Sequence, residues 1–268
     1  MEELLDPGLG SVRVWLKRDD NKARKLRYNL GHPRVLTFGG AYSNHLRAVA
    51  AAGLRHGFET IGVVRGEERL PLNPSLAYAA DRGMTLTYLD RAAYRLKHTP
   101  EVEAALRERW GEVLILPEGG SNAAAVRGCA ELPAEIEAET RGGYDVVCCP
   151  VGTGGTLAGI AAGLPTGRRA LGFAVLKGAG FLAGEVARLQ REAYGRVWEN
   201  WSIDLDHHFG GYARTTPELR AFAARHEVEE VYVAKMLHGV VDLARRGGLA
   251  PGTRVVAVVT GEPFPPRS

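Results

Sequence analysis

Short runs of strand-forming residues alternate with helix-like segments along nearly the whole chain, and this alternation constrains the fold most. The strand-like runs are 12–16, 34–38, 60–64, 85–89, 113–116, 146–149, 170–176 and 254–259. The helix-like segments are 43–56, 74–82, 100–110, 123–140 with an interruption at Pro133, 156–164, 180–194, 217–225 and 234–246. Because several runs are apolar on both faces, the pattern predicts parallel sheets that are covered by helices, an α/β fold.

Composition excludes several classes of protein. The chain has 268 residues, of which 45% are hydrophobic, enough for two modest domains or one large one. The net charge of +3 is too balanced for a nucleic-acid surface, so no nucleic-acid partner is expected. No apolar run approaches the roughly 18 residues of a membrane helix, and the acidic first residues lack an apolar signal segment. We therefore expect a cytoplasmic protein without a membrane partner.

Metal or disulfide chemistry is not indicated. The three cysteines (Cys129, Cys148 and Cys149) are odd in number and form no C-x-x-C pair. Cys148 and Cys149 lie in an apolar strand and are expected in the core. The neighbouring His207 and His208 have no further ligands at metal-binding spacing, so we predict no metal site.

A glycine-rich loop at 150–159 directly follows the apolar strand 146–149 and opens a helix. Glycines let the backbone turn tightly, and a helix N-terminus offers free N–H groups to a phosphate. The dinucleotide pattern fails because Leu157 stands where its third glycine belongs, and no Gly-Lys-Ser/Thr is present for a nucleoside triphosphate. The loop therefore favours a single phosphate ester, although a turn without a ligand has the same pattern.

The segment 17–26 is rich in charge and contains Lys22 and Lys25, three positions apart and hence on one helix face. Burial and a neighbouring cation both lower the pKa of an amine, and a neutral amine attacks aldehydes. Taken alone, the segment is more typical of a solvated, charged loop that leads into a helix. Lys177, which ends a predicted strand, is a weaker candidate for the same chemistry.

Three further turns follow predicted strands: 38–45, 117–122 and 260–262. In the first of them, Ser43 or Asn44 can cap the helix that follows, or can face a cleft. Parallel sheets bind ligands at the carboxyl ends of their strands, where these turns and the glycine-rich loop all lie. Their convergence predicts one site.

These segments together resemble the 1-aminocyclopropane-1-carboxylate deaminase/D-cysteine desulfhydrase family, whose type II pyridoxal-5′-phosphate (PLP) fold is shared with tryptophan synthase β. The resemblance spans nearly the whole chain. It is carried by KRDD, NKARKLRYNL, FGGAYSNHLRAVA, PEGGSNAAAVRGCAE, PVGTGGTLAG, VLKGAGFL, HFGGYARTTPEL, VYVAKML and the terminal VTG. It implies two domains, each with a mostly parallel sheet flanked by helices: a large PLP-binding domain (1–36 with 119–268) and a small one (37–118). It also implies a homodimer.

The resemblance further implies the roles of site residues. Lys22 would bind PLP covalently, with Lys25 as a companion cation. The other cofactor contacts would be Asn44 at the phenolate oxygen, Gly152, Thr153, Gly154, Gly155 and Thr156 at the phosphate, and Thr260 at the pyridine nitrogen. Ser43, Tyr212 and Tyr232 would lie on the substrate side. A neutral hydroxyl at the ring nitrogen favours elimination over transamination. The implied reaction converts a small amino acid to a 2-oxo acid and ammonia, with sulfide in addition from D-cysteine.

Three positions depart from the family pattern: Asp20 replaces a glycine before Asn-Lys in a shortened loop, Val233 replaces Thr or Glu after the tyrosine, and Glu262 replaces a glycine. They keep a second hypothesis open, that of a relative which binds PLP or another phosphate ligand without turnover. A third hypothesis is β-replacement of the cysteine-synthase kind, against which the segments FGGAYSNH and HFGGY argue.

Overall fold

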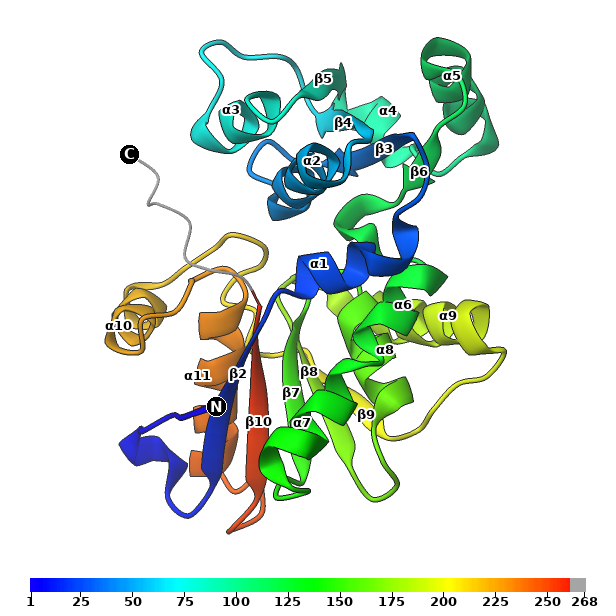
Figure 1. Ribbon diagram of the computed structural model, residues 1–268. Coiled ribbons are helices and arrows are strands. Elements are labelled where there is room, and N and C mark those ends of the chain that lie inside the picture. Colours follow the sequence, from blue (N-terminus) through cyan, green and yellow to red (C-terminus); the bar gives the residue numbers. More distant parts are fainter. Residues whose placement is uncertain (261–268) are drawn as a thin grey trace.

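The larger of two sheets forms the lower lobe in Figure 1. The structure is a computed structural model that describes residues 1–260. In spatial order, the sheet consists of β1 (Glu2–Glu3), β2 (Arg13–Asp19), β10 (Arg254–Thr260), β7 (Val146–Val151), β8 (Arg169–Ala174) and β9 (Trp201–Asp204). All neighbouring pairs are parallel except β1 with β2.

The smaller sheet forms the upper lobe and is parallel throughout. Its spatial order is β5 (Met84–Leu89), β4 (Glu59–Arg65), β3 (Arg34–Gly39) and β6 (Leu114–Leu116). The expected α/β class with two mostly parallel sheets flanked by helices is confirmed. The exact domain boundaries stay a prediction. Because β3 begins at Arg34, we propose that the first boundary lies before this strand and not at 36.

Helices cover both faces of each sheet (Figure 1). The α-helices are α1 (Asn21–Leu26), α2 (Asn44–His56), α3 (Pro74–Ala80), α4 (Arg91–Arg95), α5 (Pro100–Trp110), α6 (Ala123–Cys129), α7 (Leu132–Thr140), α8 (Gly155–Gly163), α9 (Leu182–Tyr194), α10 (Pro217–Arg225) and α11 (Val233–Arg245). Short 3-10 helices span Pro7–Leu9, Arg27–Asn29, Glu118–Gly120 and Ala179–Phe181. On the large sheet, α10 and α11 pack on one face, and α6 to α9 lie on the other.

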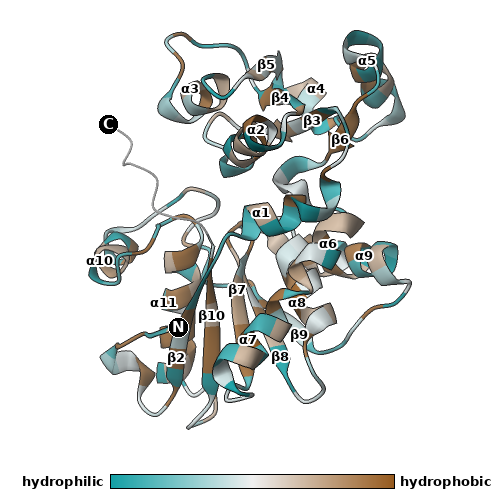
Figure 2. Cartoon of the chain, in the orientation of Figure 1, coloured by the Kyte–Doolittle hydropathy of each residue, from teal (hydrophilic) through white to brown (hydrophobic). Residues whose placement is uncertain are grey.

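Two apolar cores sandwich the large sheet, as the brown strands of Figure 2 indicate. Side chains alternate along a strand, so Cys148 belongs to the core under α11 and Cys149 to the core under α8. Both thiols are free and fully buried, which confirms the prediction that they are core residues.

The sequence pattern misses β1, β9 and α4. These elements have only two, four and five residues, too few to establish a period. The side chains of β9 are all half-buried, so this strand lacks the apolar run that marks the central strands. The predicted interruption near Pro133 is present, because α6 ends at Cys129 and Pro133 lies in the first turn of α7.

Candidate active site

The carboxyl ends of adjacent parallel strands bring the predicted segments to one edge of the large sheet. β2 ends at Asp19 and leads into α1, while β7 ends at Val151 and leads into the glycine-rich loop. Between these two strands, β10 ends at Thr260, which pairs in register with Asp19. Lys22, the loop and Thr260 therefore lie at the same edge. Glu262 lies outside the described residues.

Asp20 begins α1, and its side-chain Oδ1 accepts a hydrogen bond from the Ala23 N–H at 3.0 Å. Its φ of −78° is ordinary for any L-residue, so the backbone needs no glycine at this position. The next residue, Asn21, accepts a hydrogen bond from the Thr156 hydroxyl at 3.0 Å. The start of the lysine helix is thus tied directly to the start of α8.

Lys22 is half-buried and Lys25 is buried on the same side of α1. Burial, together with the charge of Lys25, lowers the pKa of Lys22 to about 7, and burial also lowers the pKa of Lys25. Neither lysine forms an ion pair with any residue of the described chain. Two cations that lack a protein counter-ion make this edge a site for an anion.

Lys25 connects α1 to the turn that follows β6. Its Nζ donates to the Ser121 hydroxyl at 3.1 Å and to the Gly119 carbonyl at 3.3 Å. The Ser121 hydroxyl in turn lies 2.6 Å from that of Thr153, within the glycine-rich loop. Ser121 was not among the predicted site residues; its position after an apolar strand, in a Gly-Gly-Ser turn, was the available signal.

The glycine-rich loop has the shape of a phosphate cradle. Gly154 has φ +81°, a conformation that glycine adopts without strain, and α8 begins at the next residue. A Cβ on Gly155 would lie 2.6 Å from the Ser121 hydroxyl and 3.4 Å from Lys25 Nζ. Only glycine lets the Ser121 side chain pack this closely against the start of α8, beside a buried ammonium group. The residues present therefore fit a phosphate group.

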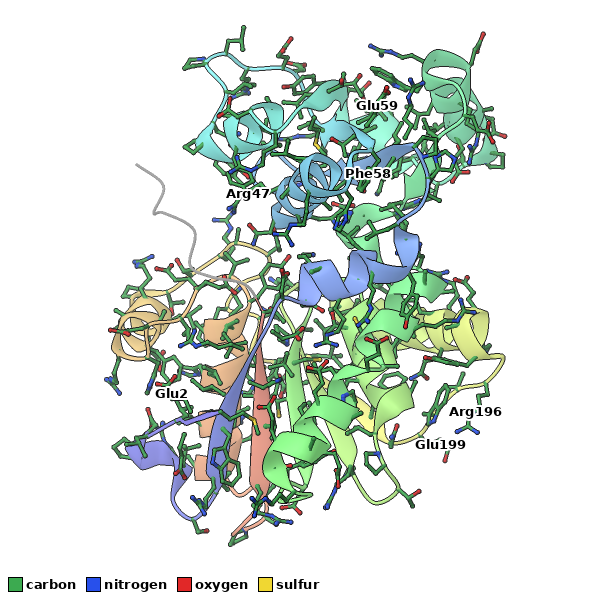
Figure 3. The ribbon with its side chains drawn as sticks, in the orientation of Figure 1. Glu2, Arg47, Phe58, Glu59, Arg196 and Glu199 are labelled. Carbon is green, nitrogen blue, oxygen red and sulfur yellow. The ribbon has the colours of Figure 1, made fainter. Side chains whose placement is uncertain are left out.

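Ser43 and Asn44 are carried by the small lobe at the start of α2, which packs against α1. Ser43 is the N-cap and accepts from the Leu46 N–H at 3.3 Å, so the capping role predicted for it is present. Asn44 is exposed, and its Oδ1 accepts from Nη1 of Arg47, which Figure 3 labels, at 3.3 Å. No described contact joins Ser43 or Asn44 to Lys22, so their roles stay predictions.

His45, the next residue, was not predicted as a site residue. It is buried, and burial followed by the charges of Lys22 and Lys25 keeps its pKa well below the usual value. The Thr37 hydroxyl donates its only proton to the Leu116 carbonyl at 3.1 Å. Its oxygen can therefore only accept from His45 Nε2, which lies 2.8 Å away and carries the ring proton. His45 is therefore a neutral ring near the two lysines, with its lone pair on Nδ1.

Tyr212 and Tyr232 are in contact with each other, and their roles on the substrate side stay predictions. Their ring centroids are 5.9 Å apart at an interplanar angle of 73°. A Cβ on Gly152 would lie 3.3 Å from the Tyr232 ring, so this tyrosine flanks the start of the phosphate cradle. Burial, followed by the neighbouring Tyr212, raises the pKa of Tyr232 well above its usual value, so its hydroxyl keeps its proton.

The remaining candidates lie elsewhere. Val233 is fully buried in the core of the large lobe. Lys177 is exposed, in contrast to Lys22, and the backbone beside it packs against Gly211. His207 bridges Asp204 and Asp242, at 2.8 and 3.0 Å.

Neither a metal cluster nor a membrane helix is present in the described part of the chain. Residues 1–260 contain no group of three or more His, Cys, Asp or Glu side chains that could hold a metal ion. Over the same range, no helix has the length and apolar character needed to cross a membrane.

Comparison with known proteins gives consistent matches. The family described as pyridoxal-phosphate dependent enzymes matches residues 4–261. A protein of Pyrococcus furiosus, provisionally named 1-aminocyclopropane-1-carboxylate deaminase, is 32% identical, with 92% of this chain and 84% of its own length covered. The 1-aminocyclopropane-1-carboxylate deaminase of Ralstonia pickettii is 27% identical, and the match covers 92% of this chain and 86% of that protein. A solved structure described as an ACC deaminase homologue superposes with a TM-score of 0.81 at 27% identity, and the match covers 93% of this chain and 84% of that one.

Proposed function

Since the chain belongs to the family of pyridoxal-phosphate dependent enzymes, we propose that it uses the site around Lys22 for elimination and deamination of a small amino acid. PLP is the cofactor, and the protein is an enzyme of the deaminase or lyase type. The names of its relatives favour 1-aminocyclopropane-1-carboxylate as substrate. D-Cysteine is the other candidate from the sequence resemblance.

The proposed cofactor site assigns each contact to a residue with suitable chemistry. The N–H groups of the cradle 152–156 and the ammonium group of Lys25 would hold the phosphate. Lys22 would bind the cofactor covalently. Asn44 would donate to the phenolate oxygen, and the hydroxyl of Thr260 would contact the ring nitrogen. The position of Thr260 beside the start of α1 supports this last assignment.

Bound PLP withdraws electrons from bonds at the α-carbon of an amino acid. Around it, the chain would move protons. Lys22, with a pKa of about 7, can accept a proton at Nζ near neutral pH and return it. Tyr232 holds its proton and would act as a donor, and Tyr212 lies beside it. Ser43 uses its oxygen to cap α2, which leaves its hydroxyl proton for the substrate.

One observation carries the proposal: Lys22 and Lys25 lie without counter-ions beside a glycine-rich loop at a helix N-terminus, where a Cβ on Gly155 would collide with Ser121. That arrangement suits an aldehyde with a dianionic phosphate. On family resemblance we also propose a homodimer and a cytoplasmic location.

The first experiment tests the lysine. The purified protein with added PLP should show the visible absorption band of a lysine-bound cofactor, and Lys22→Ala should abolish it. Lys25→Ala is the matched control, because it should weaken cofactor binding and retain the band at saturating PLP. A band that survives Lys22→Ala would assign the covalent role to another lysine.

The second experiment tests the reaction. Small D- and L-amino acids are screened for 2-oxo acid and for sulfide. 2-Oxobutyrate from 1-aminocyclopropane-1-carboxylate would establish the deaminase, and sulfide from D-cysteine would establish the desulfhydrase. Spectral shifts without product would contradict the enzymatic proposal and favour a binding protein.

A further inference from the structure

Lys235 lies on α11, and its side chain is fully buried. Its Nζ donates to the Gly211 carbonyl at 2.7 Å and to the His208 carbonyl at 3.0 Å. Among the described residues, no carboxylate lies within ion-pair distance of it. The Lys235 ammonium group thus forms its hydrogen bonds with the backbone of one loop.

A buried ammonium group without a counter-ion is costly, because the charge loses its hydration. Burial accordingly lowers the pKa of Lys235 to about 8, against a smaller opposite effect of Glu229. A methionine would fill the same volume without this cost. The two hydrogen bonds to the loop therefore explain why this buried position holds a lysine and not an apolar residue.

The loop itself has an unfavourable backbone. Phe209 has φ +51° and Ala213 has φ +54°, in the left-handed region that residues with a Cβ avoid. Between them, Gly210 and Gly211 also have positive φ. Such a segment holds its shape only if its surroundings enforce it. Lys235 binds the carbonyls of His208 and Gly211, and Tyr212 directly follows Gly211.

The first turn of α11 connects both site tyrosines. Tyr232 is the residue immediately before α11, and Lys235 lies three positions later. The Glu229 carboxylate fixes this turn, accepting from the backbone N–H groups of Val231, Tyr232 and Val233 at 2.7 Å each. One turn therefore positions Tyr232 directly and positions Tyr212 through Lys235.

We propose that Lys235 is a positioning residue whose ammonium group holds the strained loop 208–213, so that Tyr212 stays against Tyr232. The role of the tyrosines at the substrate rests on the function proposed above, whereas the anchoring of the loop does not. Lys235 acts through Tyr212 and touches neither cofactor nor substrate.

The test uses the holoenzyme of Lys235→Met, which keeps the side-chain volume and removes the donors. We expect amide hydrogen exchange in 209–213 to accelerate at least about tenfold, because the loop opens locally. The cofactor band should persist, since the cradle at 152–156 is untouched. Lys177→Met is the matched control, a lysine beside the same loop that is exposed, and it should leave exchange unchanged.

A double-mutant cycle separates positioning from general stability. Tyr212→Phe should lower kcat/KM about tenfold or more, and adding Lys235→Met to it should have little further effect. Two effects that multiply would overturn the proposal. Ala213→Gly relieves the left-handed strain, so it should restore part of the exchange protection in the Lys235→Met background.

Loop protection in Lys235→Met equal to that of the wild type would also overturn the inference, whatever the activity. If the wild type shows no turnover, the proposed function fails and the exchange data still decide the inference. Should Lys235→Met not fold, Lys235→Gln replaces it, because glutamine keeps an amide donor. In Lys235→Gln we expect the protection of 209–213 from hydrogen exchange to lie between that of the wild type and that of an open loop. Protection equal to that of the wild type would overturn the proposal there too.

Discussion

The site has two sides that are built differently, although each relies on a buried lysine. On the cofactor side, Lys25 extends from a regular helix and reaches Ser121 beside the phosphate cradle. On the tyrosine side, Lys235 extends from a regular helix and reaches the carbonyls of an irregular loop. Lys25 lies beside Gly155 of the phosphate cradle, whereas Lys235 is sealed from solvent.

This difference separates two uses of a buried cation. The charge of Lys25 has a purpose at the site, because a bound phosphate supplies its missing counter-ion. The charge of Lys235 has no such partner, and only the N–H geometry of the ammonium group matters. Substitutions on the cofactor side should therefore change affinity for PLP, and those on the tyrosine side should change loop order and turnover.

Lys25→Met tests the cofactor side with the largest expected effect. The loss of one hydrogen bond between charged groups costs about 2–3 kcal/mol, so PLP affinity should fall about 30- to 150-fold. Titration followed by the visible absorption band measures this. Exchange in 209–213 should not change; accelerated exchange there would show that the two sides are not separate.

Gly155→Ala tests the cradle. Its Cβ would meet the Ser121 hydroxyl at 2.6 Å, so we expect a loss of about 1–3 kcal/mol of stability and weaker PLP binding. Gly184→Ala is the matched control on the exposed surface of α9, where no atom lies within 4 Å of the new Cβ. It should stabilise by about 0.5–1 kcal/mol in thermal unfolding. Equal effects of the two changes would contradict the cradle.

The pH dependence of reconstitution examines Lys22. The neutral amine attacks the aldehyde, and the pKa is lowered to about 7, so the neutral fraction rises with pH through 7. Between pH 6 and 8 the initial rate of band formation from apoprotein and PLP should rise about tenfold. A rate that increases only above pH 9 would show an amine with an ordinary pKa.

His207 gives the smallest expected effect, on the tyrosine side. Its hydrogen bonds to Asp204 and then Asp242 raise its pKa in the folded state. Its contribution is therefore complete below the unfolded pKa of about 6.5 and is lost as pH rises through the folded pKa. As the pH rises from below 6.5 to above the folded pKa, the free energy of unfolding of the wild type should fall by about 1 kcal/mol more than that of His207→Gln, as measured by urea titration. Parallel curves for the two proteins would exclude this linkage.

The sequence predicts the cofactor side better than the tyrosine side. The central strands are apolar runs, the helices α2, α9 and α11 are clearly amphipathic, and the cradle follows an apolar strand. The contacts of Ser121 with Lys25 and of Lys235 with Gly211 join residues that are remote in the sequence. No local pattern announces them, because each residue type is common in solvated turns or helices. Left-handed Phe209 and Ala213 likewise depend on tertiary contacts.

The hydrogen bond between Ser121 and Thr153 joins the segment after the small sheet to the loop after β7 in the large one. Both residues belong to the large domain, whereas Asn44, the proposed contact of the phenolate oxygen, lies at the start of α2 in the small lobe. A bound cofactor would therefore contact both lobes. Thermodynamic linkage makes such an effect reciprocal: whatever draws the lobes apart weakens the cofactor by the same factor by which the cofactor favours closure. PLP would in that case serve as a clamp between lobes as well as a reagent.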